Sequence, residues 1–457
     1  MSTSGGIELL NNLKNREIFS NQLKPTALLE LNRHKSLYQR DVKGHTGCVN
    51  ALEFSNDEKY LLSGGDDGYV SLWLSGDMIS RKDAKPRRNM KSQHYSNIFS
   101  LGFSLNGDLC YSAGNDANFI QHDVETGIEI YRYDAENSIH RLDVHPTSNG
   151  VAVFGTDNGQ MTIVDTFSKE DSIYNMKSPV FSAIYNPLKP ELLCVALYRG
   201  LYIFDVRNLK SPCMKLKSEK NRCTFARWTP DGLGIVALIS ADGVSYFHDF
   251  DSDPILLADP AFLNSCTMKS CTFVDDTVLC GSDQWDIYAW KLPINTEIQK
   301  VEDAFTILKG HRSIVNHIKY SQKNNVIVSS GVEKIIKCWS PLEELPDGYQ
   351  NPERREIGQA SMIFPMASDS VEEDLYTLYQ FDKYLENAQA RREKIRNGGE
   401  DEYDSDNMES FLHDILNVEI INWNGMDDSD SDESLEHSIQ DDSASDEEDN
   451  SDMEDDS

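Results

Sequence analysis

The chain has 457 residues and a formal net charge of -33, and this charge is unevenly distributed. Residues 342–457 contain about 36 acidic and 7 basic side chains, whereas the residues before them contain about 40 acidic and 36 basic ones. A nearly neutral body with a polyanionic end argues against nucleic acid as a direct ligand, because duplex binding needs a positive field that releases counterions from phosphates. No stretch approaches the ~18 apolar residues of a membrane span, so we expect no membrane segment.

The nine cysteines occur singly, without a CxxC pair, and most lie in apolar, strand-like runs. This pattern is typical of reduced cysteines that pack in a core, and it disfavours disulfides and zinc sites. The first residues lack the basic-then-apolar order of a secretory signal. We therefore expect a protein of the nucleus and cytoplasm with no metal and no other cofactor.

Residues 1–35 are predicted to form a helical arm. Apolar side chains recur at helical spacing, Leu10 and Leu13 among them, and Pro25-Thr26 separates a first helix from a second, shorter one. Two interpretations stay open. The arm folds onto the side of its own domain, or it lays its apolar face in a groove of a partner protein.

Residues 36–341 contain an internal repeat of about 40 to 49 residues. Gly44-His45 is followed 28 positions later by Trp73, and Gly310-His311 is followed 28 positions later by Trp339. Within a unit, short alternating runs such as 49–54, 60–63 and 69–73 indicate strands separated by turns. Seven units can be counted, and they begin near His45, His94, Ala135, Lys177, Arg222, Asn264 and His311.

Repeats of this length with Gly-His and tryptophan punctuation resemble the WD-repeat family. The resemblance implies an all-β fold, a seven-bladed β-propeller. Such a ring closes when the first and last segments share a blade, which removes the free sheet edges. Residues 37–42 are the expected outer strand of the last blade.

The family's structural tetrad joins a histidine, a serine, an acidic residue and a tryptophan. The resemblance places complete sets in the first and last units: His45, Ser63, Asp67 and Trp73, and then His311, Ser329, Glu333 and Trp339. The second unit offers His94, Ser112 and Asp116 but has His122 where tryptophan is expected. Because these residues repeat at equal offsets, they indicate scaffolding, whereas a catalytic set would occur once.

Two further segments are charged. Residues 81–91 form a basic loop, which is either an ordinary exposed loop or a nuclear import signal or acidic-ligand site. Residues 342–426 are predicted to be a charged linker with short amphipathic helices, and residues 427–457 a disordered acidic tail. Serines followed by acids in this tail fit phosphorylation by an acid-directed kinase.

Certain strings resemble the cullin-4-associated factors, the substrate receptors of cullin-4 RING ubiquitin ligases. These strings lie at residues 44–51, 63–67, 94–99, 264–271, 310–316 and 329–337. Receptors of this kind often end a strand with Trp-Asp-X-Arg, whose arginine contacts the ligase adaptor, the large subunit of the damaged-DNA-binding protein. Phe204-Asp205-Val206-Arg207 matches with phenylalanine for tryptophan, whereas Val164-Asp165-Thr166-Phe167 in the preceding unit has no arginine.

The resemblance implies that the chain bridges this adaptor, and through it cullin-4, to an unknown protein substrate. Adaptor binding is expected at Phe204, Asp205 and Arg207 and at the arm residues Leu10 and Leu13. Asp205 and Arg207 have an alternative role, bracing the blade against its loop. Substrate contacts are expected on the opposite face, and loop position in the matching strings suggests Tyr95, Lys269 and Arg312.

A second hypothesis is a scaffold outside any ligase, or an acidic-tailed escort of histones or other basic proteins, because the tail supplies a polyanion. An enzyme is not expected, since the sequence contains no glycine-rich phosphate loop, nucleophile elbow or metal-ligand spacing.

Overall fold

The computed structural model describes residues 37–340, apart from residues 82, 199, 218–222, 241–242 and 295–296, together with Lys383. The predicted helical arm, with Leu10 and Leu13, lies outside the described residues. So do the predicted linker, except for Lys383, and the acidic tail. The described part of the chain is thus essentially the predicted propeller.

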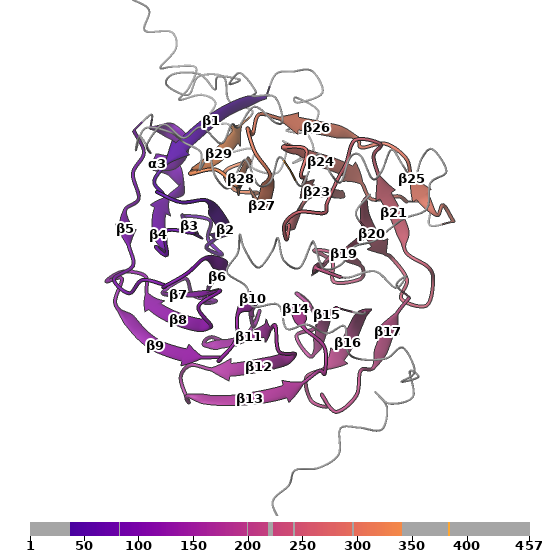
Figure 1. Cartoon of the computed structure of the whole chain (residues 1–457), viewed down its shortest axis with the longest axis horizontal. Coiled ribbons are helices and arrows are strands. Elements are labelled where there is room, and N and C mark those ends of the chain that lie inside the picture. The colour runs from indigo at the N-terminus through magenta and orange to yellow at the C-terminus, as the bar shows by residue number, and fades with distance from the viewer. Residues whose placement is uncertain are drawn as a thin grey trace, which may run out of the picture.

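Seven antiparallel sheets surround a central axis, which confirms the predicted seven-bladed fold (Figure 1). Blade 1 contains β2 (Val49–Phe54), β3 (Tyr60–Gly65), β4 (Ser71–Leu74) and β5 (Arg88–Asn89). Blade 2 contains β6 (Ile98–Phe103), β7 (Leu109–Gly114), β8 (Asn118–Asp123) and β9 (Glu129–Asp134). Blade 3 contains β10 (Ile139–Val144), β11 (Val151–Thr156), β12 (Gln160–Asp165) and β13 (Glu170–Asn175).

The remaining blades repeat this order. Blade 4 contains β14 (Val180–Tyr185), β15 (Leu192–Leu197), β16 (Gly200–Asp205) and β17 (Met214–Leu216). Blade 5 contains β18 (Phe225–Trp228), β19 (Ile235–Ser240), β20 (Gly243–Phe247) and β21 (Ile255–Ala258). Blade 6 contains β22 (Cys271–Val274), β23 (Thr277–Gly281), β24 (Asp286–Lys291) and β26 (Thr306–Lys309). Blade 7 contains β27 (Val315–Ser321), β28 (Val326–Gly331), β29 (Ile335–Ser340) and β1 (Tyr38–Lys43).

The position of a strand within its blade explains its composition. First strands lie nearest the axis and fourth strands lie at the perimeter (Figure 1). β14 is buried along its whole length, whereas β13 is almost entirely exposed. A strand that is covered on both faces has a nearly continuous apolar sequence, whereas a perimeter strand with one face in solvent can carry charged residues. Apolar clusters between neighbouring blades form the core.

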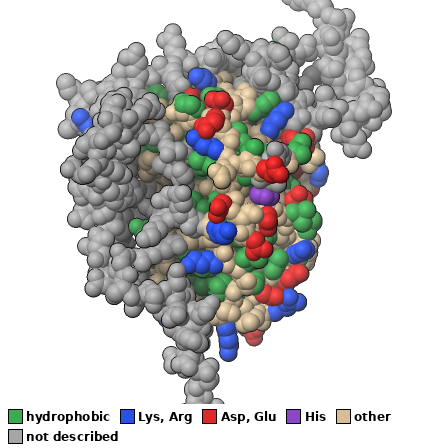
Figure 2. Space-filling model, turned by 90° about the vertical axis from the view of Figure 1, so that its right-hand side faces the viewer, with side chains coloured by type: hydrophobic (Ala, Val, Ile, Leu, Met, Phe, Trp, Pro, Cys, Tyr) green, Lys and Arg blue, Asp and Glu red, His purple; other side chains and the backbone are tan. Residues whose placement is uncertain are grey.

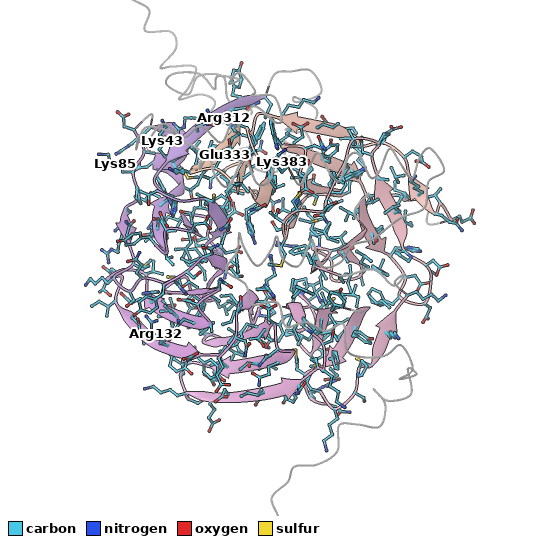
Figure 3. All side chains as sticks on the ribbon, viewed as in Figure 1. Lys43, Lys85, Arg132, Arg312, Glu333 and Lys383 are labelled. Carbon is cyan, nitrogen blue, oxygen red and sulfur yellow. The ribbon has the colours of Figure 1, made fainter. Side chains whose placement is uncertain are left out.

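The ring closes through a sheet built from both ends of the described chain. β1 pairs antiparallel with β29, with Tyr38 opposite Ser340 and Lys43 opposite Ile335. The predicted use of residues 37–42 as the outer strand of the last blade is therefore confirmed. Asp41 in β1 adds ion pairs to Lys337 and Arg312 of blade 7. Arg312 lies beside Glu333 at this junction (Figure 3).

Three elements depart from the sequence-based expectation. The helix α3 (Ser75–Ser80) follows β4, and β5 lies inside the segment predicted to be an exposed basic loop. That segment is partly anchored, because Ala84 and Met90 are buried and Arg40 donates a hydrogen bond to the Arg81 carbonyl over 2.6 Å. A short strand, β25 (Lys300–Val301), pairs in parallel with β21 and so adds a fifth strand to blade 5.

In blades 1 and 7 the tetrad residues lie within hydrogen-bond distance. Ser63 Oγ accepts a hydrogen bond from Trp73 Nε1 over 2.8 Å and lies 2.6 Å from His45 Nε2, and His45 Nδ1 lies 2.9 Å from Asp67 Oδ2. A carboxylate only accepts, so Nδ1 of the imidazole is the donor and Nε2 of a neutral ring accepts the serine proton. Blade 7 repeats the arrangement with His311, Ser329, Glu333 and Trp339.

Blade 2 lacks the last link of this chain. His94 lies 2.8 Å from Ser112 Oγ and 2.9 Å from Asp116 Oδ1. His122 takes the tryptophan position and is fully buried, and among the described residues none forms a hydrogen bond with its ring nitrogens. Burial lowers the pKa of His122 to about 4, so the ring is neutral at physiological pH.

Blade 6 uses a lysine in place of the histidine. Asp283 follows β23 at the offset at which Asp67 follows β3, and it accepts hydrogen bonds from the backbone amides of Ser265 and Cys266. Its other oxygen pairs with the Lys269 ammonium, and both side chains are fully buried. Lys269 therefore fixes the loop before β22 to the end of β23.

We expect Ser63→Ala to destabilise the propeller more than Ser112→Ala, although both serines are fully buried. Ser63 serves two partners, Trp73 and His45, whereas Ser112 serves His94 alone. Leaving a buried polar group unsatisfied costs about 1–3 kcal/mol, so the expected losses are about 2–4 and about 1–2 kcal/mol. Urea denaturation of the two variants measures them, and equal losses would contradict the unequal roles assigned to the two serines.

We expect Lys269→Met to lower the free energy of unfolding by about 3–5 kcal/mol, because it leaves the Asp283 carboxylate buried without its cation. The matched control is Lys300→Met, which breaks an exposed pair with Glu302 and should change stability by less than about 1 kcal/mol. Thermal and urea denaturation supply both values. A fully stable Lys269→Met protein would mean that the ammonium does not hold the blade.

Candidate functional site

The antiparallel blades separate the loops into two ends of the propeller. In blades 1 to 6, the connections from the first to the second strand and from the third to the fourth leave at one end, here called the lower face, as does the connection from β27 to β28 in blade 7. The connections from the second to the third strand, and from one blade to the next, leave at the other end, the upper face. Side chains of opposite sign are interspersed along the perimeter that Figure 2 shows, so no single-sign field dominates that side.

The Phe204-Asp205-Val206-Arg207 segment ends β16 and turns at the lower face. Arg207 Nε donates to Asp205 Oδ1 over 2.8 Å, and the Arg207 side chain is 73% exposed. The hydrogen bonds from Arg207 hold the pKa of Asp205 at about 2. The pair thus braces its turn, and because the guanidinium still faces outward, adaptor contact by Arg207 stays a prediction.

Phe204 is buried in the core between blades 3 and 4, together with Leu209 and Tyr185. The expected adaptor contact at Phe204 is therefore corrected, because its ring has no outward surface with which to contact a partner. Its role is to support the turn that presents Arg207. Leu10 and Leu13, the other expected contacts, lie outside the described residues.

The lower face also carries exposed apolar side chains, which we call the lower apolar patch: Leu105, Ile128, Phe167, Leu188 and Leu233. They occupy lower-face turns of four consecutive blades, 2 to 5, and Phe167 and Leu188 are 61% and 67% exposed. The sequence did not predict them, because a lone apolar residue in a turn carries no signal. They share the lower face with Arg207, and exposed apolar groups on one face indicate a candidate interaction site.

The three residues expected to bind substrate lie toward the upper face but differ in exposure. Tyr95 is 87% exposed. Arg312 is partly buried between Asp41 and Glu333. Lys269 is 2% exposed and its ammonium is held by Asp283 and Thr267, so direct substrate contact by Lys269 is corrected to a structural role.

A cavity of about 100 Å³ opens on the axis at the upper face, and all seven blades contribute to it. Its wall has one residue from near the start of each first strand: Asn50, Phe99, His140, Phe181, Thr224, Lys269 and Asn316. Thr267 Oγ1 donates to Asn316 Oδ1, Asn316 Nδ2 to Asn50 Oδ1, and Asn50 Nδ2 to Asp66 Oδ1. This relay ties blades 6, 7 and 1 together around the mouth of the channel.

The opposite side of the mouth is aromatic. His140 stacks on Phe181 with ring centroids 5.2 Å apart and lies near Phe99, with centroids 6.3 Å apart. His140 Nε2 is paired with Asp157, which fixes the ring. The mouth therefore combines a hydrogen-bonding half with an aromatic half, a combination typical of ligand pockets.

Charged side chains lie deeper in the channel. Arg141 stands 4.5 Å from the centre of the Phe225 ring, and burial and the neighbouring Arg227 lower the pKa of Arg141 to about 10. Lys319 pairs with Glu53, and burial lowers its pKa to about 8. Burial raises the pKa of Asp143 to about 6. The channel therefore holds charges of both signs, with the carboxylate of Asp66 at its mouth.

The described residues contain no group of three or more His, Cys, Asp or Glu side chains placed to hold a metal ion. No helix among them is long and apolar enough to cross a membrane. The nine cysteines form no disulfide, and Cys213 alone is exposed. Burial raises the pKa of Cys223 and of Cys338 to about 12, so these thiols pack as apolar groups.

Comparison with known proteins agrees with this geometry. The family described as "WD domain, G-beta repeat" matches residues 36–73 and 303–340. Over 418 residues, 88% of this chain, the sequence is 31% identical to DDB1- and CUL4-associated factor 5 of Mus musculus, and it matches the Homo sapiens protein of that name to the same extent. The chain spans 42% of the length of these relatives.

Two other similarities are more limited. WD repeat protein iqw1 of Schizosaccharomyces pombe is 43% identical over 65 residues, 14% of this chain and 7% of that protein. The crystal structure of the Myceliophteria thermophila Cps50 (Swd1) β-propeller domain has a TM-score of 0.55 at 19% identity, covers 66% of this chain and 99% of that domain, and shows the fold alone. The chain thus contains WD repeats, folds as a seven-bladed β-propeller, and is similar in sequence to DDB1- and CUL4-associated factor 5.

Proposed function

We propose that this chain is the substrate-recognition subunit of a cullin-4 RING E3 ubiquitin ligase and acts in the nucleus and cytoplasm. The observation that carries the proposal is the 31% identity, over 88% of the chain, to proteins whose name states association with DDB1 and CUL4. In this role DDB1 is the adaptor, and the chain supplies binding surfaces while other subunits supply the transfer chemistry. Holding the target near the charged E2 enzyme makes lysine attack effectively intramolecular.

The lower face is the proposed adaptor-binding surface. Arg207 is exposed and its planar guanidinium can form two parallel hydrogen bonds to a carboxylate or carbonyl group of a partner. The lower apolar patch lies on the same face, and its side chains gain free energy when a partner covers them. Arginine is one of the residue types enriched at interaction hot spots.

The upper face is the proposed target-binding surface, because adaptor and target must be held at the same time. Tyr95 and the axial cavity lie at this end, and the propeller separates them from Arg207. Arg312 remains a proposed contact, whereas Lys269 does not.

Affinity capture of the full chain should recover DDB1 and cullin-4. We expect Arg207→Ala combined with removal of residues 1–35 to lower this recovery at least about tenfold, the size of a lost hot spot. Arg132→Ala is the matched control, because Arg132 also pairs with a nearby acid, Glu129, but lies on β9 at the perimeter (Figure 3). Unchanged recovery with the combined variant would mean that docking does not use these elements.

A second pair of variants tests the faces separately. Phe167→Asp with Leu188→Asp places charges in the lower apolar patch and should reduce DDB1 recovery, while Tyr95→Asp on the upper face should leave it unchanged.

The alternative of an escort for basic proteins is favoured by the acidic residues 427–457. In that case removal of residues 427–457 would abolish salt-sensitive capture of histones, and loss of Arg207 would have no effect.

A further inference from the structure

Cations outnumber acids in the segment around β5, the outer strand of blade 1. Residues 81–91 contain six basic side chains and one acidic one, and neither proposed binding surface uses them. Lys85, Arg87 and Lys91 are exposed, and Figure 3 shows Lys85 on the outer side of the ring. Lys59, in the turn between β2 and β3, is exposed as well. These four side chains are here called the basic strip.

The fold holds the basic strip in place. Lys59 Nζ lies 5.1 Å and Arg87 Cζ lies 5.8 Å from the centre of the Tyr60 ring, so one aromatic side chain gathers two cations. Ala84 and Met90 are buried on either side of Arg87, which anchors the backbone between them. The backbone of the strip therefore has a defined position on the perimeter of blade 1.

Few carboxylates offset the basic strip. Among the described residues, none of its four cations forms an ion pair within 4 Å. Asp77 is paired with Arg81 at i, i+4 spacing, and Asp57 accepts a hydrogen bond over 2.6 Å from the serine two positions before it. Asp83 is the single acid within residues 81–91. The strip therefore has a positive excess, and such a surface attracts a polyanion.

Arg40 adds a further cation behind this segment. Its Nη1 donates to the Arg81 carbonyl over 2.6 Å, while its Nε and Nη2 have no hydrogen-bond acceptor among the described residues. Arg40 lies on β1, in which Tyr38 stands opposite Ser340, the last residue of β29. The chain therefore leaves blade 7 at the same strand to which residues 81–91 are fastened.

We propose that the basic strip is the docking surface of the chain's own acidic residues 427–457. These contain about 16 acidic side chains and no Lys or Arg, so their charge complements that of the strip. Residues 341–426 join them to β29, and a segment of that length spans more than about 100 Å even at the helical rise per residue. Because both partners belong to one chain, they meet at an effective concentration on the order of millimolar, and weak pairwise attractions suffice.

This occupant suits the strip better than a nucleic acid does. Duplex DNA is also a polyanion, but the residues before 342 contain about 40 acidic and 36 basic side chains and so offer no wider positive field for its phosphates. The inference goes beyond the proposed ligase role. The strip lies on blade 1 and Arg207 on blade 4, so failure of the docking would leave the ligase role untouched.

The test is fluorescence anisotropy with a labelled peptide that spans residues 427–457. The peptide should bind the chain ending at residue 426, which retains every described residue. It should bind the full chain at least about tenfold more weakly, because the attached acidic residues already occupy the strip. A control peptide with Asn and Gln in place of every Asp and Glu should bind neither chain. Equal affinity of the acidic peptide for the two chains would overturn the proposal.

Charge reversal in the chain ending at residue 426 locates the contact. The test variant changes three cations of the strip: Lys59→Glu, Lys85→Glu and Arg87→Glu. The matched control makes the same change in net charge at exposed cations of blades 3 and 4: Lys169→Glu, Lys189→Glu and Lys210→Glu. We expect the peptide's affinity to fall at least about tenfold in the test variant and less than about threefold in the control, because exposed charges farther apart than about 10 Å are screened.

The same three strip residues changed to glutamine keep the test valid if glutamate disturbs folding, and this variant should bind severalfold more weakly than the unchanged chain. Equal losses in the test and control variants would mean that net charge alone governs binding, which contradicts a docking surface on blade 1.

Two further measurements separate the other occupants. Light scattering should report a monomeric full chain, whereas a dimer that dissociates when residues 427–457 are removed would mean that the strip binds a second copy instead. A labelled DNA duplex should bind the chain ending at residue 426 more weakly than the acidic peptide does. Tighter duplex binding that the test variant abolishes would transfer the surface to nucleic acid and refute docking of the acidic residues.

Discussion

The pairing of β1 with β29 is the constraint on which the rest of the structure depends. Without the pairing of Tyr38–Lys43 with Ile335–Ser340, blade 7 has only three strands. The two ends of the propeller are then not joined by strand pairing. Joining residues about 300 positions apart costs loop-closure entropy, which grows slowly with length and must be repaid at the junction. The junction is correspondingly rich in polar contacts: Asp41 with Lys337, Lys319 with Glu53, and Ser321 with Glu58. The axial cavity and its relay exist only because this junction holds blades 7 and 1 side by side.

The distribution of tetrads follows the same logic. Complete sets occur in blades 7 and 1, on either side of the junction, where hydrogen bonds add most to a contact that chain connectivity does not enforce. Elsewhere the blades rely on packing between sheets. Trp228 Nε1 donates to the Ile184 carbonyl of the preceding blade, and Trp290 Nε1 to the Ala258 carbonyl. These buried tryptophans thus form a hydrogen bond between two blades where blades 1 and 7 have a tetrad within one blade. In blade 6 the Lys269–Asp283 ion pair takes the place of the histidine–acid pair.

What the sequence could predict depended on whether the signal was local. The strand alternation, the 28-residue offset from His45 to Trp73, and the outer strand at 37–42 are all local patterns, and they determined the fold class and its closure. Lys269 was misassigned because its partner Asp283 comes 14 residues later and only the folded blade brings the two together. Phe204 looked like part of a surface motif, yet β16 is buried on both faces up to Phe204, so the ring lies inside. The residues of the lower apolar patch come from four blades, so no single stretch of sequence reveals them.

The two ends of the propeller differ in chemistry because they are built from different parts of each blade. Lower-face turns lie at the periphery of short hairpins, where Phe167 and Leu188 can be exposed without loss of core packing. The upper mouth is formed by the first strands, which converge on the axis. Side chains from all seven blades therefore lie close together there, and polar ones form hydrogen bonds with one another. Exposed apolar surface favours a stable complex, because dissociation would return it to water. The upper mouth instead offers a narrow cavity lined by polar and aromatic side chains, so the two ends of the ring present different chemistry.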